Sequence, residues 1–117
     1  MMKINNFQIW IPLSKLCLED IPFSEFQSIV YILRVINDKE ILYIGETSNL
    51  RQRMFRNFIG GVGGGTTERI HSYLFNEDTF RNIEVSWLES TNRKLDEAQL
   101  LEEHKLKYGR LPRWNKR

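Results

Sequence analysis

The hydrophobic residues of the chain gather in three short strand-like stretches and three longer stretches with helical spacing. The strand-like stretches, at about 29–36, 41–45 and 82–88, are rich in β-branched and aromatic residues, as strands are. A polar break with Asn37 and Asp38, good turn formers, separates the first two and predicts a β-hairpin. In the third stretch hydrophobic residues alternate with Glu84 and Ser86, which predicts a half-buried strand.

The helical stretches are predicted at about 49–58, 67–75 and from a cap within 90–92 to Tyr108. In the first, Leu50, Met54 and Phe58 recur at i, i+4 and i+8 and form a core-facing stripe. In the second, the inward residues are expected to be Ile70 and Leu74. The third ends before Gly109, a natural C-cap. Its inner face is expected to hold Leu95, Ala98, Leu101 (or Leu100) and Leu106.

Residues 1–28 are predicted to be an N-terminal strap that packs on the core through Trp10, Leu16 and Leu18. Cys17, which lies among leucines, is expected to be a small buried hydrophobe. The predicted order is therefore β-β-α-α-β-α behind this strap. It indicates an α/β (α+β) fold with a small three-stranded, mainly antiparallel sheet flanked by helices. We expect a single domain over 1–117 whose motif-bearing core is 29–115.

Length and net charge say little about the class of protein or its binding partner. The 117 residues fit one domain, and a net charge of +2 does not by itself indicate a nucleic-acid partner. Residues 104–117, however, contain six basic side chains and no Asp or Glu. Such a tail either binds phosphate or is simply a solvated basic segment.

Two further features bear on location and on loops. The chain has one cysteine, so no internal disulfide forms, and no apolar run approaches the ~20 residues of a membrane span; we expect a cytoplasmic protein without membrane contact. The glycine-rich segment 60–65 has neither P-loop nor dinucleotide-binding spacing. It is either a flexible connector between two helices or a loop whose bare backbone lies close to a phosphodiester chain.

The best candidates for chemistry are two tyrosines of the predicted hairpin, Tyr31 and Tyr43. Side chains alternate along a strand, so the two can share one face of the sheet in a suitable register, which the sequence does not fix. Arg53 follows on the flank of the next helix, beside the Leu50–Phe58 stripe.

Together with later motifs, these residues resemble the GIY-YIG nuclease superfamily, which includes the N-terminal incision domain of bacterial excision repair and homing endonucleases. The similar segments cover about 29–115 in the family's order. They are Val30-Tyr31, Tyr43-Ile44-Gly45, the helix start Thr47-Ser48-Asn49-Leu50-Arg51-Gln52-Arg53, the late helix Glu97-Ala98-Gln99-Leu100-Leu101-Glu102, and the closing Pro112-Arg113-Trp114-Asn115.

The resemblance implies a metal-dependent DNA endonuclease, with a role in DNA repair as one possibility within the family. By position, the catalytic residues would be Tyr31, Tyr43, Arg53, Glu102 and Asn115. Glu102 would hold one Mg²⁺ (or Mn²⁺), while Glu97 begins the same motif and is the less expected ligand. DNA would be the partner, and the expected nucleic-acid-binding residues are Gly45, Arg51, Arg56, Lys105 and Arg113.

The residue types suit this chemistry. One carboxylate suffices for Mg²⁺, which keeps several waters and takes phosphate oxygens as ligands. An arginine can hold a non-bridging phosphate oxygen. A tyrosine with a pKa of about 10 is a poor base at neutral pH unless its environment lowers that value. We expect Tyr31 to orient or deprotonate water and Tyr43 to orient water or phosphate, although the two roles could be exchanged.

Three positions depart from the family pattern. Ile29 replaces the leading glycine, Glu46 follows the second motif where lysine is frequent, and Asn57 stands where many members have His or Tyr. They motivate an alternative function, a catalytically weak or inactive nucleic-acid-binding module. Since no appended DNA-reading module is visible, specificity is expected to come from DNA structure, strand ends or a separate partner.

Overall fold

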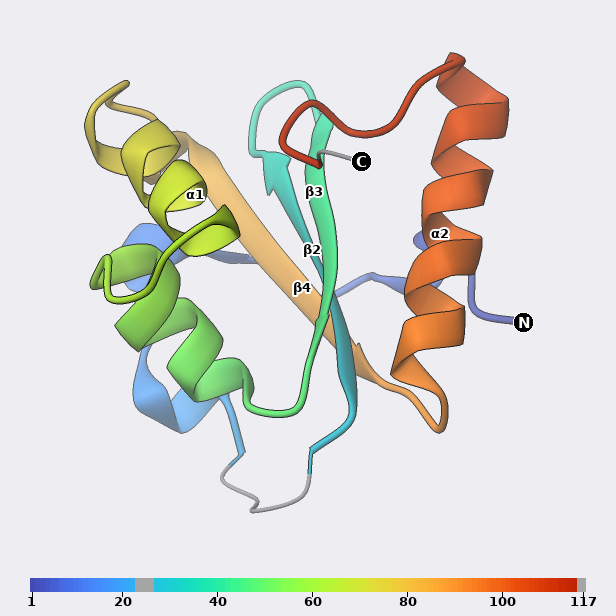
Figure 1. Ribbon diagram of the computed structural model, residues 1–117, viewed down its shortest axis with the longest axis horizontal. Coiled ribbons are helices and arrows are strands. Elements are labelled where there is room, and N and C mark those ends of the chain that lie inside the picture. Colours follow the sequence, from blue (N-terminus) through green and yellow to red (C-terminus); the bar gives the residue numbers. More distant parts are fainter. Residues whose placement is uncertain (23–26, 116–117) are drawn as a thin grey trace.

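A four-stranded antiparallel sheet forms the centre of the computed structural model, which describes residues 1–22 and 27–115 (Figure 1). The strands are β1 (Ile11–Pro12), β2 (Ile29–Val35), β3 (Ile41–Thr47) and β4 (Ile83–Glu89), in the spatial order β1-β4-β2-β3. The predicted α+β class is confirmed. The sheet has a fourth strand because part of the expected strap pairs with β4, Ile11 opposite Val85.

Helices cover both faces of this sheet. The π-helical segment η4 (Gln52–Ile59) and helix α1 (Thr66–Phe75) lie on one side, and α2 (Arg93–Tyr108) lies on the other (Figure 1). Short 3₁₀ turns occur at η1 (Ile4–Asn6), η2 (Leu13–Lys15), η3 (Leu18–Asp20) and η5 (Phe80–Asn82). No helix within the described ranges combines the length and apolar character needed to cross a bilayer.

The sheet therefore has a hydrophobic core on each face. The core under η4 and α1 contains Tyr31 and Leu33 together with the predicted helix stripe Leu50, Met54 and Phe58, all of which are buried. The core under α2 is built from the alternate strand residues, such as Val30, Ile32 and Ile44. The alternation of a strand sends its side chains to opposite faces, so β2 supplies both cores.

Burial on both faces corrects the prediction that β4 is half buried. Glu84, expected on a solvated face, is buried. It is compensated by Arg34, whose Nε lies 2.6 Å from Glu84 Oε2 across the β2–β4 pair. The alternating pattern thus identified the strand, but an ion pair let a charged residue occupy a covered face.

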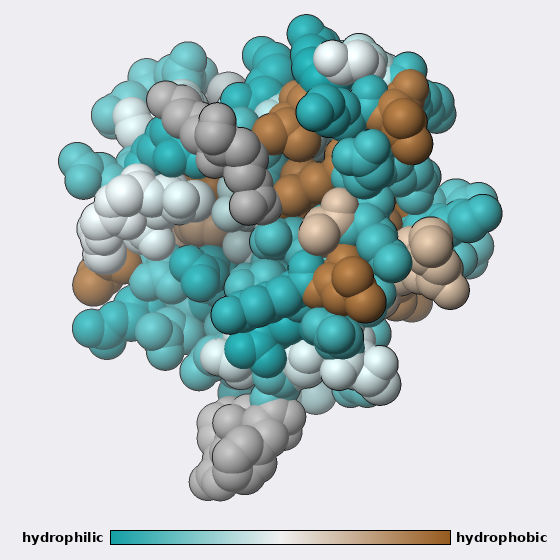
Figure 2. All heavy atoms as spheres, turned by 45° about the vertical axis from the view of Figure 1, so that its right-hand side comes forward, coloured by the Kyte–Doolittle hydropathy of each residue, from teal (hydrophilic) through white to brown (hydrophobic). Residues whose placement is uncertain are grey.

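The ends of α2 agree with prediction, and its inner face agrees in part. Asn92 caps the first turn by accepting a hydrogen bond from Leu95 N, and Gly109 ends the helix with φ 76°. Leu101 and Leu100 are buried as expected, and so is His104, whereas Leu95, Ala98 and Leu106, also expected to face inward, are exposed. Figure 2, in which the α2 side is turned forward, shows hydrophobic side chains dispersed among hydrophilic ones.

Cys17 is also placed differently from the prediction, because it is exposed. Its neighbours Leu16 and Ile21 are the residues that enter the core. The chain turns between them at η3, where the side chain of Asp20 accepts a hydrogen bond from Cys17 N (2.8 Å). The turn directs Cys17 and Leu18 to solvent.

Candidate active site

The register of β2 and β3 brings the two candidate tyrosines together. Tyr31 lies opposite Gly45, and Leu33 lies opposite Tyr43. Both tyrosines share the face under η4, with ring centroids 6.0 Å apart and planes tilted by 36°. Phe58 of η4 closes the cluster at 6.1 Å from each ring. The register, which the sequence left open, therefore produces a tyrosine pair.

Gly45 makes room for this pair. A Cβ atom at this position would lie 2.6 Å from Cζ and Oη of Tyr31 and 2.6 Å from Cε2 of Tyr43. Carbon atoms in ordinary contact are about 3.5–4.0 Å apart. Gly45 was predicted to bind nucleic acid, but it is buried beneath the rings, and the absence of its side chain is what the tyrosine pair requires.

The two tyrosines differ in exposure and in electrostatic surroundings. Tyr31 is fully buried, and this burial raises its pKa well above the ordinary value, with a further increase from the nearby Tyr43. Tyr43 is half-buried; burial raises its pKa, the charge on Glu97 raises it further, and the charges on Arg53 and Arg69 lower it. The interaction between the two hydroxyl groups also raises the pKa of Tyr31 and lowers that of Tyr43.

Two arginines, one from each helix on this face, complete the surroundings. The guanidinium carbon of Arg53 on η4 lies 5.8 Å from the ring centroid of Phe58, and Arg53 Nε is buried without a hydrogen-bond partner. Arg69 on α1 has a buried, unpartnered Nε as well. Its Nη2 donates to the backbone oxygen of Trp114 (2.8 Å). Arg69 was not among the predicted site residues, because nothing in its local sequence separates it from a surface helix charge.

Asn115 ties the C-terminal segment to the strand that carries Tyr43. Its side-chain amide accepts a hydrogen bond from Ile44 N (3.0 Å) and donates one to Ile44 O (2.9 Å). One residue earlier, Trp114 N donates to Leu42 O (2.8 Å). The two hydrogen bonds of Asn115 are consistent with the predicted role of this residue as a brace for the site.

The acidic residues of α2 lie in a neighbouring groove rather than in one cluster with the tyrosines. A cavity of about 550 Å³ runs along α2 and is lined by Glu46, Glu97, Glu102 and Lys105, among others. Glu102, the predicted metal ligand, is exposed there. Glu97 is the α2 carboxylate whose charge acts on both tyrosines. In the described part of the chain, no three or more His, Cys, Asp or Glu side chains are arranged to hold a metal by themselves.

The family model of the GIY-YIG catalytic domain matches residues 27–112, which include both tyrosine strands, η4 and α2. The chain belongs to the GIY-YIG family. GIY-YIG domains are generally nucleases that act on DNA and typically use a divalent metal. No curated protein and no solved structure matches the chain.

The three departures from the GIY-YIG pattern have structural explanations. Glu46 points to the opposite sheet face from Tyr43 and pairs with Arg93 (Nε to Oε2, 2.6 Å). Asn57 donates from Nδ2 to Val62 O (2.8 Å) and so supports the chain after η4. Ile29 is buried in the core. The negative charge of Glu46 is therefore paired and directed away from the tyrosine face of this GIY-YIG domain.

The other predicted DNA-contacting residues are scattered. Arg51 donates from Nε to Ile21 O (2.7 Å), and Arg113 forms an ion pair with Glu40 (2.7 Å). Arg56 and Lys105 are exposed. The last two basic residues of the predicted tail, at 116 and 117, lie outside the described residues. The structure thus gives two of these cations protein partners and leaves two facing solvent.

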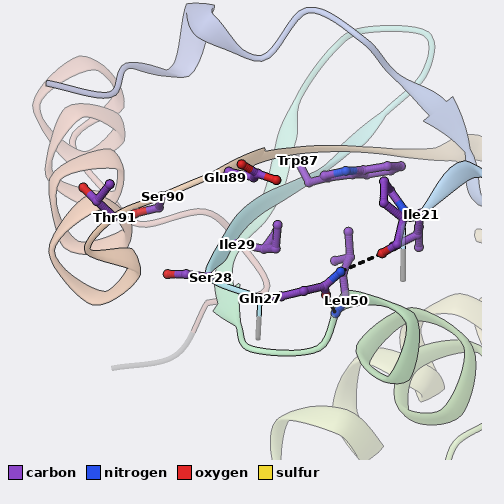
Figure 3. A pocket seen from close by; sticks show the side chains of 10 residues that line it. Ile21, Gln27, Ser28, Ile29, Leu50, Trp87, Glu89, Ser90 and Thr91 are labelled. Carbon is purple, nitrogen blue, oxygen red and sulfur yellow. Dashed lines mark hydrogen bonds between the residues drawn. The ribbon is translucent and has the colours of Figure 1, made fainter. Parts of the chain in front are cut away.

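A separate cavity of about 530 Å³ lies where β2 and β4 meet the start of η4 (Figure 3). Trp87 and Ile29 line it from the sheet and Leu50 lines it from the helix side, with Gln27 bonded to Leu50 N (2.9 Å). Its lining includes neither tyrosine nor Arg53, and its charged side chain is the carboxylate of Glu89, which repels phosphate. We therefore place the candidate active site of the GIY-YIG domain at the tyrosine cluster.

Proposed function

We propose that the chain is a metal-dependent endonuclease that hydrolyses phosphodiester bonds in DNA at the tyrosine cluster. The observation that carries this proposal is the convergence of Tyr31 and Tyr43 over Gly45, with the charge of Arg53 acting on both tyrosines, in a domain of the GIY-YIG family. Hydrolysis of a phosphodiester requires an oriented water, stabilisation of charge on the phosphate oxygens and protonation of the leaving oxygen. These residues offer hydroxyl and guanidinium groups for such tasks.

In this mechanism Tyr43 faces the substrate, and Tyr31 holds the Tyr43 side chain in place. Both tyrosines keep their protons at neutral pH because burial raises both pKa values. We infer that Tyr31 donates a hydrogen bond to the Tyr43 oxygen, which leaves the Tyr43 hydroxyl hydrogen for a water or phosphate oxygen. This reverses the assignment favoured on sequence, because Tyr31 is buried and Tyr43 is half-exposed.

The remaining residues bind and brace. Arg53 would hold a non-bridging phosphate oxygen, and Asn115 would fix β3, and with it Tyr43, through its two hydrogen bonds to Ile44. The charge of Arg53 acts on both tyrosines, which supports a guanidinium close to a phosphate bound beside Tyr43.

The carboxylates along α2 suit Mg²⁺ or Mn²⁺. Their hard oxygen ligands are those that Mg²⁺ prefers, and it is commonly held by one or two carboxylates plus water and phosphate. Two glutamates are candidates for the metal ligand. Glu102 has the position of the family's metal-binding glutamate, whereas Glu97 is the one whose charge raises the pKa of both tyrosines. When bound, the ion would supply Lewis-acid activation of the phosphate and an acidified water.

The test is a nicking assay on supercoiled plasmid, single-stranded and branched DNA with Mg²⁺ or Mn²⁺. Tyr43→Phe should lower the rate at least about 100-fold, the loss expected for a group that handles protons. Glu97→Gln and Glu102→Gln identify the metal-binding carboxylate, and the variant of that residue should lose activity. Glu77→Gln, an exposed carboxylate outside the site, is the control. Wild-type rates in the Tyr43 variant and in both glutamate variants would exclude this site.

One observation favours the alternative of a non-catalytic nucleic-acid-binding module. The complete burial of Tyr31 keeps one of the two family tyrosines away from solvent. This alternative predicts salt-sensitive DNA binding without cleavage under any divalent metal. The same assay, combined with a DNA-binding titration, separates the two functions.

A further inference from the structure

The two arginines above the tyrosine pair share an unusual feature. In the described residues, Arg53 Nε and Arg69 Nε are the buried side-chain nitrogen or oxygen atoms that lack a hydrogen-bond partner. Buried polar atoms in folded proteins are nearly always partnered, and each exception calls for an explanation such as an absent ligand. Two such guanidinium groups on adjacent helices place two positive charges on the tyrosine face of the sheet, and an anion is a suitable partner for them.

Arg69 is held by the C-terminal segment, which is also hydrogen-bonded to the strand that carries Tyr43. Its Nη2 donates to Trp114 O (2.8 Å), and the Trp114 ring stacks on Tyr73, one turn further along α1, at a centroid distance of 5.1 Å. The next residue, Asn115, is bonded to Ile44 beside Tyr43. Arg69 is therefore held on the same segment that braces the tyrosine strand.

The charge of Arg69 affects the pKa of Tyr43, the more exposed of the two tyrosines. Burial and the charge on Glu97 raise the pKa of Tyr43, and the charges of Arg53 and Arg69 both oppose this. The two cationic side chains thus act on the same hydroxyl as the carboxylate of Glu97 and oppose its effect. Cationic side chains around a site attract an anionic phosphodiester.

We infer that Arg69 is a second phosphate-binding residue, whose guanidinium acts together with that of Arg53 on the phosphodiester next to Tyr43. The inference rests on the proposed function and extends it. A guanidinium fork matches two phosphate oxygens, so arginines on two helices can hold one group from two directions. With Nη2 bound to Trp114 O, the other donors of Arg69 remain for the phosphate.

The simpler role for Arg69 is to anchor the C-terminal segment through Trp114. The two roles differ in how binding depends on salt, because each phosphate contact with a single strand contributes about 0.7 to the slope of log K against log salt. An anchoring residue affects stability but has no such contact. Arg69→Lys keeps the charge while changing the bond to Trp114 O, and Arg69→Gln removes the charge.

The experiment measures the anisotropy of a short labelled single-stranded DNA over a series of salt concentrations without divalent metal, so that no cleavage occurs. Arg69→Gln should bind about tenfold more weakly, as expected for loss of one charged hydrogen bond, with the slope reduced by about 0.7. Arg69→Lys should keep the slope, and Arg81→Gln, an exposed arginine of η5, should match the wild-type protein.

A tyrosine titration by ultraviolet absorbance gives a second readout that needs no DNA. The pKa of Tyr43 should rise in Arg69→Gln and stay unchanged in Arg81→Gln. A wild-type salt slope in folded Arg69→Gln, or a slope lost equally in Arg69→Lys and Arg69→Gln, overturns the inference. Because neither measurement uses cleavage, this result is distinct from a failed nicking assay, which would count against the proposed function.

Discussion

Replacing Gly45 with alanine tests the geometry of the tyrosine pair directly. The added Cβ would lie 2.6 Å from Cζ and Oη of Tyr31 and from Cε2 of Tyr43. Ordinary carbon contacts are about 3.5–4.0 Å, so each ring would have to move by roughly 1 Å. Tyr31 is fully buried against Tyr43 and Phe58 and has no space in which to retreat.

The cost follows from this overlap. Overpacking a well-filled core destabilises by about 1–3 kcal/mol. In a domain of this size each kcal/mol lowers the melting temperature by about 4 °C, so the Gly45→Ala protein should melt about 4–12 °C below wild type. Separation of the two hydroxyls should also reduce any nuclease activity. Thermal unfolding followed by circular dichroism measures the first effect, and the nicking assay measures the second.

Gly64→Ala is the matched control. Gly64 lies in the exposed loop before α1, and a Cβ added there meets no atom within 4 Å. Alanine should leave stability unchanged or raise it by about 0.4–1 kcal/mol, because it restricts the unfolded chain. Equal melting temperatures for Gly45→Ala and Gly64→Ala would show that the tyrosine rings do not lie this close to Gly45.

Two further predictions concern the same strands. Because burial raises the pKa of Tyr31 in the folded state, the unfolded state releases this proton first as pH rises past about 10, so stability should fall above that pH and fall less in Tyr31→Phe. Urea denaturation at pH 8 and pH 11 measures this, and an equal loss in both proteins would contradict it. Asn115→Ala removes two hydrogen bonds to Ile44 and should destabilise by about 1–3 kcal/mol, with faster hydrogen exchange at the Ile44 amide; unchanged exchange would argue against bracing.

Local patterns in the sequence predicted the elements well. The spacing of Leu50, Met54 and Phe58 identified a helix and its buried side, because a helical stripe needs only neighbouring residues to be recognised. The cap at Asn92 and the stop at Gly109 were likewise encoded within a few residues. The ordered motifs predicted the family, which the family model confirms.

What depended on distant contacts was not predictable. Leucines occur on several sides of α2, so the sequence did not separate Leu100 and Leu101, which are buried as expected, from Leu106, which is exposed. The burial of Glu84 requires Arg34, which lies 50 residues earlier in the chain. Arg69 joins the candidate site only through the packing of α1 and the course of the C-terminal segment. In each case the deciding partner is far away in sequence.

The C-terminal segment also has a consequence for assembly, because β3 is an edge strand of the sheet. An exposed edge offers unpaired backbone groups to other chains, and proteins often cover it. Trp114 N pairs with Leu42 O, and the Asn115 side chain occupies both backbone groups of Ile44, as a neighbouring strand would. At the opposite edge, β1 has only two residues. The C-terminal segment thus covers part of the β3 edge, which protects the domain against edge-to-edge aggregation.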